Sequence, residues 1–147
     1  MTQRYKRPES VLVVIHTPDR QVLMLRRREP ADFWQSVTGS LAWDETALEA
    51  ARRELVEETG FAPEDLVDTG RVNRFPIIPP WRARYAPEAS ENVEHLFTLR
   101  LPHPTAPRLN PGEHLEWRWL SWTDAAALAS SWTNRDAILA LGEGDHA

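Results

Sequence analysis

The sequence predicts a single domain that combines strands and helices, the α/β (α+β) class, over residues 1–147. The run 11–15 is apolar throughout, as in a strand buried on both faces. The stretch 46–60 has the end signals and spacing of an amphipathic helix. A chain of 147 residues, 41% of them hydrophobic, suits one domain with a sizeable core.

The composition narrows the class of function. The chain has no cysteine, which excludes disulfides and thiol chemistry and permits the cytoplasm, where we expect the protein. The first ten residues lack an apolar signal core, and no apolar run could span a bilayer. A net charge of −5 argues against general nucleic-acid binding. We therefore expect a small-molecule partner, with neither nucleic acid nor membrane; the oligomeric state is left open.

The first elements are two strands with a basic end. Residues 10–16 and 21–27 are expected to form a hairpin around the turn 18–20. Alternation places Arg27 on one face and its neighbours Arg26 and Arg28 on the other. The basic run is either a solvated strand end or, with Lys6, a phosphate contact, since guanidinium groups match phosphate oxygens. Residues 32–38 form a further short strand, in which we expect Trp34 to be a core residue.

The central helix is predicted from its two ends and its apolar stripe. Thr46 and Glu49 have the spacing of a capping box, and Gly60 ends the helix. Residues 48, 51 and 55 (Leu, Ala and Leu) make the buried stripe.

An acidic patch lies beside that stripe. Glu54, Glu57 and Glu58 are spaced i, i+3 and i+4, so their carboxylates share one face and repel each other. Arg53 could pair with Glu57, and a Mg²⁺ ion would remove the conflict, because it prefers oxygen ligands. The alternative is a solvated acidic helix without metal. Within 39–61, six acids and two bases give −4; the rest, with 16 acids and 15 bases, gives −1. This concentration suits metal-assisted binding of an anion.

The rest of the chain contains an apolar loop, a glutamate at a loop end, three further strands and two helices. The apolar loop 76–81 could hold a flat ring or make a dimer contact, and His16 and His95 are expected to be packing residues. Glu113 sits at a loop end, where it is either a surface glutamate or a residue that reaches a metal. The expected elements are strands over 66–75, 92–101 and 115–120, a helix from a Thr123 cap to 130, and a helix over 131–141.

The spacing of the acidic segment resembles the Nudix hydrolase signature. Gly39 is followed after five residues by Glu45, and seven residues later comes the stretch 53–61, Arg-Glu-Leu-Val-Glu-Glu-Thr-Gly-Phe. Further segments, 5–8, 33–40, 84–87, 131–135 and more loosely 112–120, resemble the subfamily of bacterial dihydroneopterin triphosphate diphosphatases. The resemblance implies a mixed sheet between helices and Mg²⁺-dependent hydrolysis, with Mn²⁺ as a substitute cofactor. For this subfamily the products are dihydroneopterin monophosphate and pyrophosphate, in folate biosynthesis.

The resemblance also implies roles for individual residues. Gly39 and Arg53 support the glutamates, and the general base is Glu57 or Glu54 by position or Glu113 by reach. The expected metal ligands are Glu54, Glu57, Glu58 and Glu113. The expected substrate contacts are Lys6, Arg27, Thr38, Phe75, Pro76, Ile77, Ile78 and Ser131.

The signature loop departs from the family pattern at Ala42 and Asp44, and a missing glutamate at 42 could remove an outer metal contact. Three alternatives follow from the residues. A Nudix enzyme for modified nucleoside triphosphates would share the whole signature. A non-catalytic nucleotide-binding sensor would usually lack some of the glutamates that are present here. A structural acidic module would bind no metal.

Overall fold

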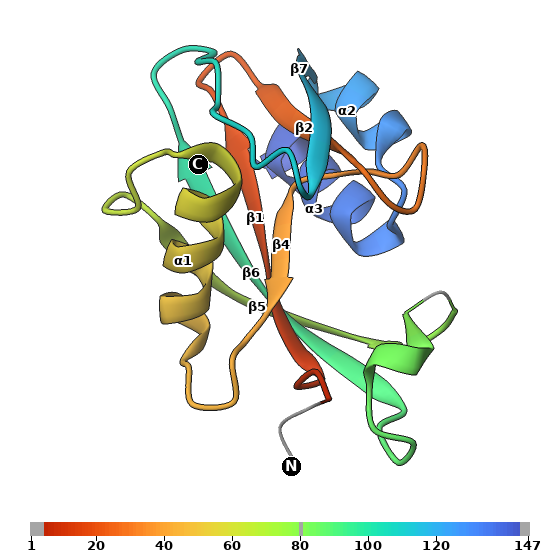
Figure 1. Cartoon of the computed structure of the whole chain (residues 1–147). Helices are drawn as coiled ribbons and strands as arrows, with labels where there is room; N and C mark the ends of the chain where they lie inside the picture. The colour runs from red at the N-terminus through yellow and green to blue at the C-terminus, as the bar shows by residue number, and fades with distance from the viewer. Residues whose placement is uncertain (1–4, 80, 145–147) are drawn as a thin grey trace.

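The computed structural model describes residues 5–79 and 81–144 (Figure 1). The predicted domain boundaries, the first four residues of the N-terminal stretch and Pro80 of the apolar loop therefore lie outside the described residues. Within them, no helix is long and apolar enough to cross a membrane. The elements are β1 (Glu9–His16), β2 (Gln21–Arg27), β3 (Trp34–Gln35), β4 (Val37–Ser40), α1 (Ala47–Thr59), β5 (Val67–Pro76), the 3₁₀ turn η2 (Arg82–Arg84), β6 (Glu91–Arg100), β7 (His114–Ser121), α2 (Trp122–Leu128) and α3 (Trp132–Gly144).

A mixed seven-stranded sheet lies between helices, which confirms the predicted fold class. The main path of the sheet is β3-β2-β1-β6-β5, with β4 paired to β1 and β7 paired to β2. Strand β1 runs parallel to β6 and antiparallel to β4. Helix α1 covers one face, and α2 and α3 cover the other (Figure 1).

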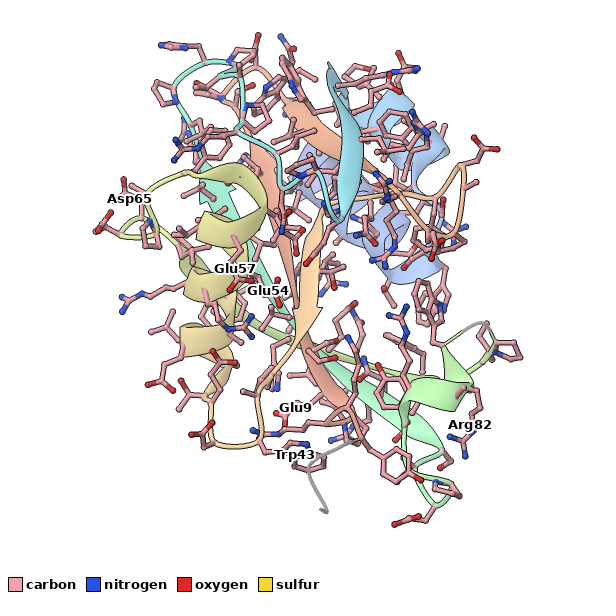
Figure 2. The ribbon with its side chains drawn as sticks, viewed as in Figure 1. Glu9, Trp43, Glu54, Glu57, Asp65 and Arg82 are labelled. Atoms are coloured by element: carbon pink, nitrogen blue, oxygen red, sulfur yellow. The ribbon has the colours of Figure 1, made fainter. Side chains whose placement is uncertain are left out.

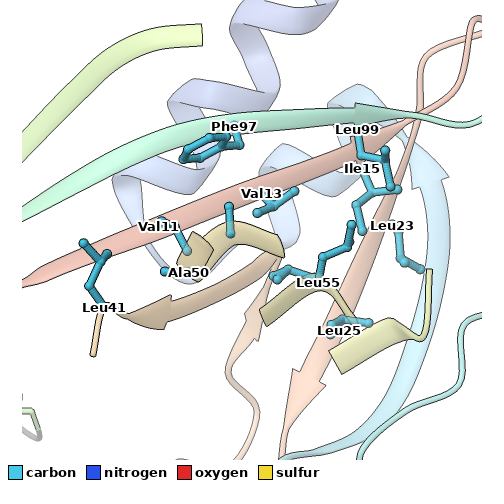
Figure 3. Packing of buried hydrophobic residues seen from close by; sticks show 12 residues of the cluster. Val11, Val13, Ile15, Leu23, Leu25, Leu41, Ala50, Leu55, Phe97 and Leu99 are labelled. Carbon is cyan, nitrogen blue, oxygen red and sulfur yellow. The ribbon is translucent and has the colours of Figure 1, made fainter. Parts of the chain in front are cut away.

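Strand β1 is buried on both faces, as its apolar run predicts. Val11, Val13 and Ile15 pack in the core beneath α1, shown close up in Figure 3. Leu12 and Val14 pack on the opposite face, in the core formed with α2 and α3. The continuous apolar run is explained by these two cores, because successive side chains of a strand point to opposite faces.

The predicted hairpin is confirmed, although its two strands pair only near the turn. Strands β1 and β2 are joined by a short turn, but His16 and Val22 are their one pair of directly opposed residues. Strand β1 instead pairs with β4 and β6, and β2 pairs with β7 over most of its length.

Helix α1 has the predicted caps, and two of the three residues predicted for its buried stripe, Ala51 and Leu55, are buried in the core. Thr46 and Glu49 form the capping box, and Gly60 ends the helix with φ of 75°, a left-handed conformation that favours glycine. Leu48 is 39% exposed, so its place in the buried stripe was wrong. The face that packs on the sheet includes Glu54 and Glu58 instead.

Two helical boundaries near the C-terminus also differ from prediction. Helix α2 is capped by Ser121, which accepts a hydrogen bond from the Asp124 amide (3.2 Å), and not by Thr123. It ends at Leu128, because the chain then turns so that the Ser130 amide donates to the Trp34 carbonyl oxygen (3.0 Å). Trp34 itself is buried, as expected for a core residue.

Candidate active site

A cavity of about 730 Å³ opens beside the signature segment. Its wall combines the end of β2, the β4 strand, helix α1, the β5–η2 loop, β6 and the N-terminus of α3. Many of the predicted site residues line it together: Lys6, Arg27, Thr38, Gly39, Glu54, Phe75, Pro76, Ile77, Ile78, Glu113 and Ser131. Most of the residues predicted from the sequence therefore lie in one cavity.

The glutamates of α1 lie at one end of this cavity. Glu54 and Glu58 are 8% and 1% exposed. Gly39 on β4 makes room for the first of them, since a Cβ atom at Gly39 would lie 2.0 Å from Glu54 Oε2. A side chain at Gly39 would have to displace the carboxylate. This glycine therefore supports the glutamates, as the signature implies.

Burial dominates the ionisation of this carboxylate pair. It raises the pKa of Glu58 well above its usual range, and the hydrogen bond and charge of Glu54 raise it further. Burial also raises the pKa of Glu54, opposed by the hydrogen bond from Glu58 and by Arg53. Burial thus makes it costly for both carboxylates to be ionised side by side without a cation. Its Oε1 atom is buried and has no hydrogen-bond partner among the described residues.

Arg53 holds the acidic end together. Its guanidinium donates to Glu45 (2.7 and 2.8 Å), to Glu54 (3.0 Å) and to the Ser40 carbonyl oxygen (3.1 Å). The predicted contact with Glu57 is present but longer, at 3.4 Å. The hydrogen bonds that Arg53 donates to Glu45, together with the charges of Glu54 and Glu45, raise the pKa of Arg53. Arg53 therefore orients Glu54 and carries a fixed positive charge.

Glu57 and Glu113 differ from the buried pair in their exposure. Both Glu54 and Glu57 come from α1 (Figure 2), but the side chain of Glu57 is 48% exposed and does not line the cavity. Glu113 lies in the turn before β7, exposed at the cavity wall, and its charge contributes to the raised pKa of Glu58. Glu57 nevertheless stays close to Glu54, because Arg53 Nη1 contacts both carboxylates, at 3.0 Å for Glu54 and 3.4 Å for Glu57.

The buried pair fits a divalent cation. No three His, Cys, Asp or Glu side chains in the described ranges are grouped as a complete metal site. Mg²⁺, however, is usually bound by only one or two carboxylates together with water and substrate phosphates. Two adjacent buried carboxylates, one with an oxygen that has no partner among the described residues, match that requirement. Because burial raises the pKa of both, a bound cation would favour their ionised forms.

His114, at the start of β7, lies against the buried pair. Its Nε2 atom is 3.9 Å from Glu58 Oε1 and 3.1 Å from the Gln35 amide nitrogen. Burial, helped by the charge of Arg27, lowers the pKa of His114 to about 4, so the ring is neutral near pH 7. His114 was not predicted to be near the site, because its spacing carries no metal-ligand signal.

The signature loop is held by two residues of the segment 5–8, Arg7 and Tyr5. The Arg7 guanidinium donates to the carbonyl oxygens of Ala42 (2.9 Å), Trp43 (3.2 Å) and Glu45 (2.9 Å). The Trp43 indole donates to the Tyr5 carbonyl oxygen (2.9 Å). These bonds use main-chain atoms of the loop, so its shape does not depend on a particular side chain at position 42.

Cations line the cavity near the acidic end. Arg27 and Arg84 place their guanidinium carbons 5.1 and 5.4 Å from the Trp81 ring centre. Burial lowers the pKa of Lys6, with a further contribution from Arg84, and burial likewise lowers the pKa of Arg27. Arg26 does not line the cavity and instead forms an ion pair with Glu116 (2.9 Å).

Two further predicted substrate contacts, Thr38 and Ser131, are polar groups at the wall. The Thr38 hydroxyl donates to the Val11 carbonyl oxygen (2.8 Å). Ser131 caps α3 by accepting from the Asn134 amide (3.3 Å).

The predicted packing role of His95 is incomplete, because its Nε2 atom lies 2.6 Å from Glu9 Oε2.

Four wall residues have no site signal in the sequence. Trp81 lies in the apolar loop and Arg84 in the segment 84–87, while Asn92 and Glu94 lie in a predicted strand. Nothing in local spacing marks these residues, because the wall forms only when β6 and η2 come together at the cavity.

The chain matches known proteins over most of its length. The family model described as NUDIX domain matches residues 6–141. The dihydroneopterin triphosphate diphosphatase of Escherichia coli (strain K12) is 48% identical over 139 residues, 91% of each chain. The Haemophilus influenzae protein of that name is 39% identical, over 94% of this chain and 89% of that one. The solved structure of the E. coli dihydroneopterin triphosphate pyrophosphohydrolase superposes with a TM-score of 0.85 at 47% identity, covering 91% and 94% of the two chains.

Proposed function

This chain belongs to the NUDIX family, and from that premise we propose that it hydrolyses dihydroneopterin triphosphate to dihydroneopterin monophosphate and pyrophosphate. The proposed reaction depends on Mg²⁺, takes place in the cytoplasm and serves folate biosynthesis. The predicted resemblance to Nudix hydrolases is confirmed by the family match and by the relatives. The relatives' printed names support the choice of substrate.

The observation that carries the reaction class is the pairing of opposite charges in one cavity. Glu54 lines the cavity with Glu58 buried behind it, and Lys6, Arg27 and Arg84 line the same cavity. A bare acidic helix would repel a triphosphate, whereas cations at the wall bind its outer oxygens. The site is therefore suited to a polyphosphate that approaches carboxylates.

Glu54 and Glu58 would hold the metal, with Glu113, from the turn before β7, as a further ligand. A bound divalent ion supplies charge neutralisation and polarises the phosphorus–oxygen bond. Arg53 keeps the Glu54 carboxylate in position through its bond of 3.0 Å. Lys6, Arg27 and Arg84 bind phosphate oxygens and neutralise the charge that develops on the pyrophosphate leaving group.

The residue that takes the proton from water is one of the glutamates. Glu54 lies at the cavity wall, and Glu113 reaches the same wall from an exposed turn. Glu57 is less suited to this role than the sequence implied, because it faces solvent beside Arg53. We propose Glu54 or Glu113 as the general base.

A substrate panel tests the proposal. Initial rates of pyrophosphate release would be measured for dihydroneopterin triphosphate, the common nucleoside triphosphates and 8-oxo-dGTP, with Mg²⁺ and with EDTA. We expect the highest kcat/KM for the pterin substrate and no turnover in EDTA. A higher kcat/KM for a nucleotide would replace the substrate and keep the chemistry. No turnover of any compound would contradict the proposed activity.

A further inference from the structure

Two buried hydrogen-bond acceptors without partners line the cavity on strand β6. Glu94 is 5% exposed and Asn92 is 4% exposed, and both belong to the cavity wall. Glu94 Oε1 and Asn92 Oδ1 have no hydrogen-bond partner among the described residues. Buried polar atoms are normally satisfied, so two open acceptors on one wall indicate that a ligand supplies the donors.

Both side chains are held in place by neighbours that leave these oxygens free. The Asn92 amide nitrogen donates to Ser10 Oγ (2.8 Å), which leaves its carbonyl oxygen available. Ser10 lies directly opposite Glu94 across the parallel β1–β6 pair. Thr133 and Asn73 hydrogen-bond to the Glu94 carboxylate, and Thr133 is 2.9 Å from the Ser131 hydroxyl. The wall is therefore a built polar surface.

No cation in the described ranges pairs with Glu94, in contrast to the carboxylates of α1. Burial raises the pKa of Glu94, opposed by the hydrogen bonds from Thr133 and Asn73. The cations of the cavity wall (Lys6, Arg27 and Arg84) act on the acidic end of the site and not on Glu94. A ligand with neutral N–H groups can satisfy this carboxylate without bringing a full charge.

We infer that Glu94 and Asn92 bind the amino-pyrimidinone edge of the substrate, with Glu94 accepting from the ring N–H and the adjacent exocyclic amino group. A carboxylate has two oxygens and accepts two parallel N–H bonds, which is the pattern that this edge presents. The same edge occurs in a pterin and in guanine. Adenine, cytosine and uracil lack this donor pair, and hypoxanthine lacks the amino group.

This inference rests on the proposed function, because it assigns one end of the same cavity to the ring of the substrate. Apolar side chains of the wall, including Leu12, Ile77 and Trp132, provide surfaces for a flat ring beside the two acceptors. Of the two roles expected for the loop 76–81, a ring contact or a dimer contact, this placement favours the ring contact. Glu94 is thus proposed to select the substrate, while the glutamates of α1 act on its phosphates.

Binding of two matched nucleotides tests the role of Glu94. The probes are the α,β-methylene analogues of GTP and ITP, which differ only in the exocyclic amino group. Their Kd values would be measured by calorimetry with Mg²⁺ for wild type, Glu94→Gln and Glu94→Met. Glu91→Gln is the matched control, because Glu91 lies on the same strand and is exposed. Thermal unfolding of each variant establishes that it is folded.

We expect wild type and Glu91→Gln to bind the guanine analogue about tenfold more tightly than the hypoxanthine analogue, as for a hydrogen bond to a charged group. The preference should fall to about threefold or less in Glu94→Gln and disappear in Glu94→Met. An equal affinity in wild type, or an unchanged preference in a folded Glu94→Met, would overturn the inference. Turnover of dihydroneopterin triphosphate, measured in parallel, separates this failure from failure of the proposed function.

Discussion

The two ends of the cavity both bury glutamate, but their neighbours differ. At the α1 end, Glu54 and Glu58 hydrogen-bond to each other, and Arg53 contacts Glu54 at 3.0 Å. At the β6 end, Glu94 is bound only by neutral groups. A paired, crowded set of carboxylates suits a cation, whereas an isolated carboxylate suits neutral N–H donors. Burial of a carboxylate therefore does not identify its ligand; the groups around it do.

The largest expected effect follows from removing the charge at the α1 end. We expect Glu58→Gln to lower kcat by about 10³-fold or more while the protein stays folded, because the amide fills the same space but cannot hold the metal. Steady-state rates with Mg²⁺ and a thermal unfolding curve measure both effects. Glu57→Gln is the control and should lose far less, since Glu57 faces solvent. Near-normal activity of Glu58→Gln would remove it from the metal site.

A smaller effect is expected from displacing a carboxylate that stays charged. Gly39→Ala would place a Cβ atom 2.0 Å from Glu54 Oε2, so the side chain must move. We expect kcat/KM to fall about 10²-fold, as for a misplacement of about 1 Å. Gly70→Ala is the contrast: its φ of +77° predicts lower stability, and with nothing within 4 Å of the added atom, activity should be kept. Full activity of Gly39→Ala would show that this close contact does not position Glu54.

The cations should act on binding more than on the chemical step. Lys6→Ala or Arg27→Ala is expected to raise KM by about tenfold and to lower kcat less, because these groups hold phosphate in both the ground and the transition state. Arg26→Ala is the control, since Arg26 pairs with Glu116 outside the cavity. An unchanged KM in both variants would exclude Lys6 and Arg27 from the site.

The smallest effect concerns stability at the β6 end. The pKa of Glu94 is raised above 4.5, so the native state binds its proton more tightly than the unfolded state does. Stability should therefore fall as pH rises from the unfolded pKa through the folded pKa. We expect Glu94→Gln to unfold about 2–4 °C above wild type at pH 8, because removing the buried charge raises the free energy of unfolding by about 1 kcal/mol. At pH 4 we expect the two proteins to unfold at the same temperature. A difference that does not change with pH would contradict an uncompensated buried carboxylate.

Local signals predicted the α1 end well. The capping box, the glycine stop and the spacing of Gly39, Glu54 and Glu58 all depend on residues close together in the chain. The predicted burial of Leu48 was wrong, because helical spacing gives the direction of a side chain but not how far the sheet extends beneath the helix. The β1–β2 hairpin was predicted correctly, but the sequence did not show how short its pairing is, because β4 and β6, from later in the chain, pair with most of β1.

The β6 end could not be predicted from local signals. Alternation places Asn92 and Glu94 on one face of β6, but both faces of that strand are partly buried, so the pattern does not mark a site. The wall also needs Trp81 and Arg84, which approach from a loop, and Thr133 from α3. Such convergence depends on the tertiary fold.

The most direct test of the central claim is phosphorus NMR of the products formed from dihydroneopterin triphosphate, with and without Mg²⁺. We expect pyrophosphate and a monophosphate ester to appear together in equal amounts, only with the metal present. Release of inorganic phosphate instead, or product formation at the same rate in EDTA, would contradict metal-dependent pyrophosphate release at this site.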